Sequence, residues 1–140
     1  MFELRKILEL TPVIPVMTID RIEQALPLAE ALLDGGLRVL EITLRSEAAL
    51  PAITAIAQAF PQAVLGAGTV LDASALRAAQ AAGADFVVSP GCTDALLDAA
   101  EDNNMPILPG ACTPSEVMRL LARGVTTMKF FPAEAAGGLS

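Results

Sequence analysis

Six apolar runs of strand length recur along the chain, and segments with helical periodicity separate them. The runs begin near Val13, Val39, Ala63, Phe86, Pro106 and Thr127, so the starts of successive runs lie 20 to 26 residues apart. The helical segments between them span residues 22–33, 48–59, 73–82, 94–103 and 114–122. Strands that alternate with helices and lack hairpin turns pair in parallel with right-handed crossovers, so the pattern predicts successive βα units.

Local signals mark the ends of these helical segments. Glycines follow the helices at 35–36, 83 and 124, where a left-handed residue after the last turn favours glycine. Side chains that accept a hydrogen bond from the first turn precede the helices, and the predicted N-caps are Asp20, Asp72, Thr93 and Thr113. These signals agree with the periodicity of the apolar residues.

Length and composition limit the class of protein. A chain of 140 residues with 54 % hydrophobic and 4 % aromatic residues predicts one domain over residues 1–140, with an aliphatic core. The net charge of −7 makes nucleic acid a poor partner, since no cluster of Lys and Arg could follow a phosphate backbone. Cys92 and Cys112 lack metal-ligand spacing, so we expect no metal site, and reduced thiols with packing roles in a cytoplasmic protein.

Two stretches bear on a membrane or export role. The first ten residues contain charged side chains where a secretory signal needs an unbroken apolar run, so no export is expected. Residues 48–71 carry no charge and are long enough to cross a bilayer. Pro61 interrupts that stretch and a strand-like run follows it, which favours a buried helix and a buried strand over a membrane span.

The second apolar run indicates which α/β architecture the chain adopts. Within residues 39–45, Glu41, Thr43 and Arg45 share one face of the expected strand, and the other face is apolar. A central strand of an open doubly wound sheet is covered by helices on both faces and is usually apolar throughout. A barrel strand can instead direct polar residues inward near its carboxyl end. The sequence therefore predicts a (β/α)8-barrel fold.

The last apolar run, TMKFFP at residues 127–132, places a lysine inside a buried strand. By alternation, Lys129 and Phe131 face the same side, which is the barrel interior if the strand is central. The alternative is a solvated lysine on an edge strand, where charge blocks pairing between sheets. A desolvated lysine amine can attack a carbonyl and form a Schiff base, and Glu41 is the inward acid that could move the protons.

Five motifs in order resemble one enzyme family. LEITLRSE, GAGTV, VVSPG, ILPGACTPSE and KFFPAEAAGG, at residues 40–47, 66–70, 87–91, 107–116 and 129–138, are similar to the 2-keto-3-deoxy-6-phosphogluconate (KDPG) aldolase and 4-hydroxy-2-oxoglutarate aldolase family. The resemblance extends from about residue 14 to 139. It implies a class I aldolase of the Entner–Doudoroff pathway that needs no metal or other cofactor. It also implies a homotrimer.

The resemblance also assigns roles to individual residues. The implied substrate is a phosphorylated 2-keto-3-deoxy acid, cleaved to pyruvate and glyceraldehyde 3-phosphate, with Lys129 as the Schiff-base lysine and Glu41 as the general acid/base. The residues that hold or enclose the pyruvate portion are then Arg45, Thr69, Pro90 and Phe131. Simpler roles are an ion pair of Arg45 with Glu41 or Glu47 and a β-forming role for Thr69.

The chain has six of the eight βα units that a closed barrel requires. We therefore expect a C-terminally truncated aldolase barrel with impaired activity, since the loops after strands seven and eight commonly form the phosphate site. A second hypothesis is that the chain is a non-catalytic fragment, which associates with other chains through its open barrel edges. A third is an open six-stranded α/β binding domain with a cleft at a topological switch point.

Overall fold

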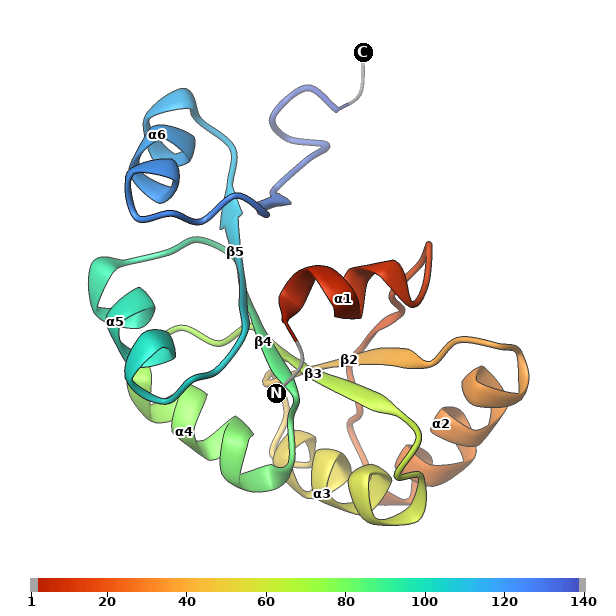
Figure 1. Cartoon of the computed structure of the whole chain (residues 1–140). Coiled ribbons are helices and arrows are strands. Elements are labelled where there is room, and N and C mark those ends of the chain that lie inside the picture. The colour runs from red at the N-terminus through yellow and green to blue at the C-terminus, as the bar shows by residue number, and fades with distance from the viewer. Residues whose placement is uncertain (1–2, 139–140) are drawn as a thin grey trace.

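The computed structural model describes residues 3–138 and contains six parallel strands joined in sequence by helices (Figure 1). Leu139, the last residue of the family resemblance, lies outside the described part. The sheet order is β1-β2-β3-β4-β5-β6, and the strands are β1 (Val16–Met17), β2 (Val39–Thr43), β3 (Val64–Gly68), β4 (Phe86–Ser89), β5 (Ile107–Ala111) and β6 (Lys129–Phe130). The sheet curls into part of a barrel, as the alternation in the second run predicts.

The helices confirm the predicted alternation. They are α1 (Leu4–Glu9), α2 (Ala25–Asp34), α3 (Ala49–Ala59), α4 (Ala73–Ala82), α5 (Asp94–Asp102), α6 (Pro114–Ala122) and the short 3-10 helix η1 (Ile22–Gln24). Helices α2 to α5 cover the convex side of the sheet in Figure 1. Residues 48–71 fold mainly as α3 and β3, and no helix within residues 3–138 is long and apolar enough to cross a membrane.

Three of the four predicted N-caps are confirmed. The side chains of Asp72, Thr93 and Thr113 accept hydrogen bonds from the backbone N–H three residues later. The prediction for Asp20 is wrong. The segment expected as one helix over residues 22–33 is divided into η1 and α2, and the N–H of Arg21 instead donates to the Gln24 side chain at 3.1 Å.

Alternation along the strands separates two apolar layers. On the convex side, residues such as Leu40 and Ile42 of β2 pack in the large core cluster beneath the helices. On the concave side, a smaller cluster forms at the amino-terminal ends of the strands, and its buried members are Ile7, Val39, Val64, Phe86 and Val88. The polar residues of β2 lie on this same concave face, further toward the carboxyl ends.

Helix α1 supplies the one member of the concave cluster that comes from outside the sheet. Ile7 is fully buried, and Leu4 packs against the same cluster. Figure 1 shows α1 on the concave side, opposite the other helices. This helix was not among the predicted elements, although Leu4 and Ile7 have the spacing of one helix face. The helix forms a floor over β2, β3 and β4 on the concave face and leaves the carboxyl ends of the strands open.

The first strand is shorter than its apolar run. The run begins near Val13, but the strand begins at Val16, because Pro15 has no N–H to donate to a neighbouring strand. Cys92 and Cys112 are free thiols, as expected, and Cys92 packs against the core. Burial raises the pKa of the Cys92 thiol above its ordinary value.

Candidate active site

The predicted site residues gather at the carboxyl ends of the parallel strands. Thr69, Pro90 and Phe131 each come one residue after the end of β3, β4 and β6, and Arg45 comes two residues after β2. Because all six strands are parallel, these positions lie along one edge of the sheet. Arg45 was expected within the second strand, but β2 ends at Thr43. Arg45 instead lies in the turn after β2, and it is exposed.

Glu41 lies deeper, inside β2. Its side chain is only 5 % exposed, although it carries an ionisable group. Gly68 of β3 makes room for it, because a Cβ at position 68 would fall on the Glu41 Oε1 atom. In the same way, a Cβ at Gly66 would fall on the ring of Phe86. The two glycines of the GAG sequence therefore leave the inner face of β3 free for side chains from both neighbouring strands.

Burial and nearby charge act on Glu41 in opposite directions. Loss of hydration raises the pKa of its carboxyl group, while the positive charges of Lys129 and Arg45 act to lower it. Burial has the larger effect, so the group holds a proton more firmly than an exposed glutamate. No ion pair within 4 Å joins Glu41 to either cation among the described residues. This environment suits a carboxyl group that both accepts and releases a proton.

Lys129 belongs to β6, whose only described sheet neighbour is β5. It pairs with Gly110 in the sheet register and is half-buried. Its Nζ atom lies 4.5 Å from the centroid of the Phe131 ring, which confirms that the two side chains share a face. Met128 packs on the opposite side, against the cluster of α5 and α6. Lys129 therefore lies on an edge strand within the described residues, and its side chain still turns toward the polar concave face.

Thr69 has an uncommon backbone conformation. Its φ of 59° lies in the left-handed region, which β-branched residues rarely adopt. Strain of this kind is often found where a side chain must be held in a particular direction. A simple β-forming role does not explain it, because Thr69 lies outside β3. Nor does the described part of the chain contain an ion pair of Arg45 with Glu41 or Glu47.

The loop after β4 approaches β5 closely. A Cβ at Gly110 would collide with the carbonyl of Pro90, so glycine at 110 permits the Pro90 loop to lie beside β5. Pro90 itself is half-buried. Gly110 is also the register partner of Lys129. Pro90 and Lys129 therefore both lie beside Gly110 of β5.

The structure adds one polar pair that the sequence analysis did not assign to the site. Thr43 is 1 % exposed, and its hydroxyl donates to the carbonyl of Met17 at 3.2 Å. The Thr18 hydroxyl lies 3.0 Å from that of Thr43. The polar face of residues 39–45 indicated that Thr43 points inward, but its partner is 25 residues away in sequence. These hydroxyls join β1 to the polar part of the concave face.

Metal ligands and cavities do not coincide with this site. Residues 3–138 contain no group of three or more His, Cys, Asp or Glu side chains that could hold a metal ion. A cavity of about 640 Å³ lies beside α5 and β5, and its mostly apolar lining includes none of the six predicted site residues. We therefore place the candidate site by its polar side chains on the open concave face.

The comparisons with known proteins agree with the motifs. A family model described as "Aldolase: KDPG and KHG aldolase" matches residues 4–140. The KHG/KDPG aldolase of Escherichia coli K12 is 50 % identical over 133 residues, which cover 95 % of this chain and 62 % of that protein. The 2-dehydro-3-deoxy-phosphogluconate aldolase of Zymomonas mobilis is 48 % identical over 139 residues, covering 99 % and 66 %. The chain thus spans about three fifths of the length of such relatives.

A solved structure is similar throughout the chain. The KDPG aldolase of Legionella pneumophila, with pyruvate captured at low pH as a covalent carbinolamine intermediate, has a TM-score of 0.92 and 46 % sequence identity. The match covers 96 % of this chain and 65 % of that one. Fold and sequence therefore point to the same relatives.

Proposed function

Because this chain belongs to the KDPG and KHG aldolase family, we propose that it provides the Schiff-base half of an aldolase site. The substrate is 2-keto-3-deoxy-6-phosphogluconate, and the products are pyruvate and glyceraldehyde 3-phosphate. The observation that carries this proposal is the placement of Lys129 and Glu41 on the concave face, where the positive charge of Lys129 acts to lower the pKa of the buried Glu41 carboxyl group. Within residues 3–138, Glu41 is the only acidic residue and Lys129 the only lysine inside a strand.

The chemistry begins at the lysine. The neutral Lys129 amine attacks the C2 carbonyl carbon, and the resulting carbinolamine loses water to give a protonated imine. Glu41, directly or through a water molecule, takes the proton from the C4 hydroxyl. The C3–C4 bond then breaks, its electron pair moves into the imine as an enamine, and the aldehyde departs. Protonation at C3 and addition of water release pyruvate and restore the amine.

The remaining residues fit roles around the pyruvate portion. The guanidinium of Arg45 can bind the substrate carboxylate through two parallel hydrogen bonds, and its position beyond β2 leaves it free to do so. The strained Thr69 adds a hydroxyl at the end of β3. Pro90 and Phe131 form the wall, and the Phe131 ring also faces the Lys129 ammonium.

The relatives support the proposed covalent chemistry and the proposed class of substrate. The Legionella protein carries pyruvate as a covalent carbinolamine, the kind of adduct that precedes the release of pyruvate in the mechanism proposed for Lys129. The Escherichia coli relative is named a KHG/KDPG aldolase, so 4-hydroxy-2-oxoglutarate is a second candidate substrate. Cleavage of either substrate gives pyruvate, and the enzyme residues described here act on that shared portion.

The finer architecture also belongs to this proposal. We place residues 1–140 in one (β/α)8-barrel domain, with six of its eight units, and expect the trimeric assembly that the family resemblance implies. Loops after strands seven and eight of such barrels commonly bind phosphate, so the role we propose for the six units described here concerns the pyruvate portion of the substrate. The two free thiols are consistent with the cytoplasm.

A direct experiment tests the proposal. The purified chain is incubated with pyruvate and reduced with borohydride, and peptide mapping locates any mass adduct, with Lys129→Ala as the control. We expect one adduct, at Lys129. A folded chain without an adduct would contradict the proposal and support the second candidate, a non-catalytic assembly component. The observation that favours this second candidate is the exposure of Val16 (57 %) and Phe130 (44 %) on the two edge strands.

A further inference from the structure

We propose that Arg123 is a positioning residue for Lys129, an inference that rests on the function proposed above. Arg123 acts through a network of ion pairs between α5 and α6, which we call the α5–α6 clasp. The members of the clasp are Asp94, Asp98, Glu101, Arg119 and Arg123.

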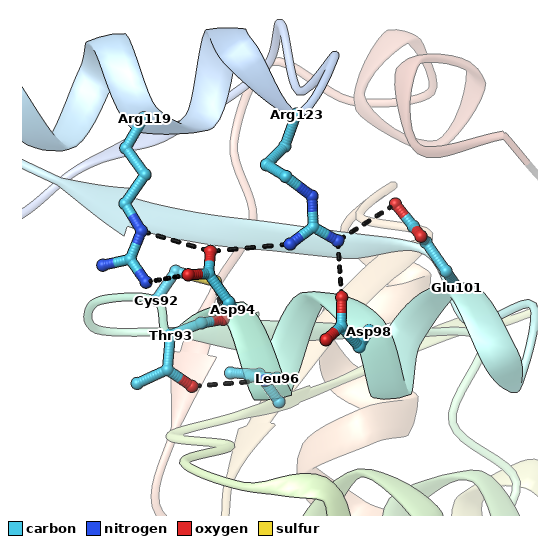
Figure 2. Close-up of polar contacts among 8 residues, drawn as sticks. All are labelled: Cys92, Thr93, Asp94, Leu96, Asp98, Glu101, Arg119 and Arg123. Carbon is cyan, nitrogen blue, oxygen red and sulfur yellow. Dashed lines mark hydrogen bonds and ion pairs between the residues drawn. The ribbon is translucent and has the colours of Figure 1, made fainter.

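The clasp joins two helices that are consecutive in sequence (Figure 2). Arg119 contacts Asp94 at 2.6 Å between Nη2 and Oδ2. Arg123 contacts Asp98 at 2.7 Å, Asp94 at 3.5 Å and Glu101 at 3.6 Å. The Arg123 side chain is 28 % exposed, compared with 51 % for Arg119, so it is the less solvated cation of the two. One guanidinium thus bridges three carboxylates spread along α5.

Helix α6 buries little apolar surface. Its one buried residue is Leu120, while Met118 and Leu121 are 69 % and 51 % exposed. The cavity of about 640 Å³ lies beside α5 and reaches Val125, just after α6. A smaller one, about 120 Å³, lies between Leu97 of α5 and Leu120. Leu120 packs with Leu97 and Ala111 in a small cluster, and because so few apolar residues of α6 are buried, the network of ion pairs has a larger share in fixing α6 than at an extensively packed interface.

The position of α6 determines that of Lys129. Only six positions separate Arg123 from Lys129, and β6 contains two residues. Within the described residues, β6 pairs with β5 alone, through the register pairs Gly110–Lys129 and Ala111–Phe130. By contrast, Glu41 belongs to β2 and Thr69 directly follows β3, and both of these strands have strand neighbours on both sides. A loosened clasp therefore displaces the lysine and leaves the partners of the substrate carboxylate in place.

This difference gives the inference a kinetic signature. In R119Q/R123Q, we expect the maximal rate constant of pyruvate trapping to fall roughly tenfold, since small displacements of a reacting group are costly. The half-saturating pyruvate concentration should change by less than about twofold, because Arg45 and Thr69 are unaffected. Because unfolded chains in exchange with folded ones would also lower the rate constant, the rate constant of each variant is divided by its folded fraction, measured by circular dichroism.

Two controls separate the clasp from charge in general. R5Q removes an exposed ion pair of α1, Arg5 to Glu9 at 3.2 Å, and should trap pyruvate at the wild-type rate. About 1 M salt should slow the wild type, because it screens the clasp, and should have little effect on R119Q/R123Q. Exchange of charge in D98R/R123D should recover most of the rate lost in R123D.

The outcomes are distinguishable. An unchanged rate constant in R119Q/R123Q, or no recovery in the charge-exchanged variant, would overturn the inference while leaving the proposed function intact. If the wild type forms no adduct, the proposed function fails, and amide hydrogen exchange over residues 125–131 decides the inference. Faster exchange there in R119Q/R123Q than in R5Q would support the clasp as the element that holds β6, and equal exchange would overturn it.

Discussion

The carboxylate of Glu41 lies over Gly68, in the space that a methyl group at position 68 would occupy. The register of the sheet explains this contact. Glu41 is paired with Gly66, so its side chain leans two residues toward the carboxyl end of β3. A glycine on one strand therefore allows an acid on the next to be buried close to the mouth of the site.

Gly68→Ala should displace the Glu41 side chain. Since the new Cβ would meet Glu41 Oε1, we expect a loss of about 1–3 kcal/mol in unfolding free energy and much slower pyruvate trapping. Urea unfolding and the borohydride assay measure the two effects. Gly91→Ala is the matched control, because a Cβ there has no heavy atom within 4 Å. Equal stability of the two alanine variants would argue against the contact.

Glu41→Gln should stabilise the protein while it removes proton transfer. The folded state raises the pKa of Glu41 above its ordinary value of 4.5, so the charged form is penalised on folding. That penalty is absent below the unfolded pKa and develops as pH rises through the folded pKa. The stability gain of the variant should therefore be larger at about pH 8 than at about pH 4.

Glu116→Gln provides a control of opposite sign for this pH dependence. Backbone N–H groups of Cys112 and Thr113 donate to the Glu116 carboxylate at 2.8 and 2.9 Å and lower its pKa. Its contribution is present above the unfolded pKa and is lost as pH falls through the folded one. The variant should be less stable than wild type at neutral pH. If the stability gain of Glu41→Gln did not change with pH, this would contradict a buried carboxylate whose charged form is disfavoured in the folded state.

Thr69→Gly should relieve backbone strain and weaken pyruvate binding. A left-handed non-glycine residue costs roughly 1–2 kcal/mol, and the entropy of glycine offsets part of that gain, so stability should rise by about 1 kcal/mol or less. Loss of the hydroxyl should raise the half-saturating pyruvate concentration. Asn104, with φ of 50°, is remote in sequence from the site, and Asn104→Gly should relieve strain without changing trapping. Unaltered trapping in Thr69→Gly would remove Thr69 from the site.

Ile7→Ala tests the role of α1 as the floor of the curled sheet. Ile7 is fully buried against Val39, Val64 and Phe86, so we expect a loss of about 2–5 kcal/mol in unfolding free energy. Leu10→Ala, at a side chain that is 39 % exposed, should cost about 0.5 kcal/mol or less. Chemical denaturation compares the two variants. Similar losses would mean that α1 does not close the concave face.

The alternation of apolar and polar residues in strands, together with the N-cap residues of the helices, was enough to predict most of the fold. The period of two in residues 39–45 placed Glu41 and Thr43 on the concave face, and the N-caps at Asp72, Thr93 and Thr113 marked three helix starts. Local signals were sufficient there because the determining partners lie within a few residues. The same alternation wrongly extended the predicted strand to Arg45, whereas β2 ends at Thr43, because the turn after a strand can continue its alternation of side chains.

Features that depend on distant partners had no such signal. The concave position of α1 follows from contacts with three strands, and Leu4 and Ile7 alone make too short a pattern to reveal it. The contact of Gly68 with Glu41, and that of Arg123 with Asp98, join residues 27 and 25 positions apart. Their spacing reflects the length of a βα unit, and only the three-dimensional arrangement identifies them as pairs.

The floor formed by α1 has a consequence for the order of events in a turnover. With the amino-terminal end of the concave face filled by Ile7 and Phe86, the carboxyl ends of the strands serve as both entrance and exit. In the proposed mechanism, pyruvate is still attached to Lys129 after bond cleavage, whereas the aldehyde is free. The free aldehyde must leave before the next substrate can enter, and pyruvate follows only after hydrolysis. We therefore expect ordered release on the proposed mechanism, since pyruvate stays covalently bound until hydrolysis, and product-inhibition patterns would reveal that order.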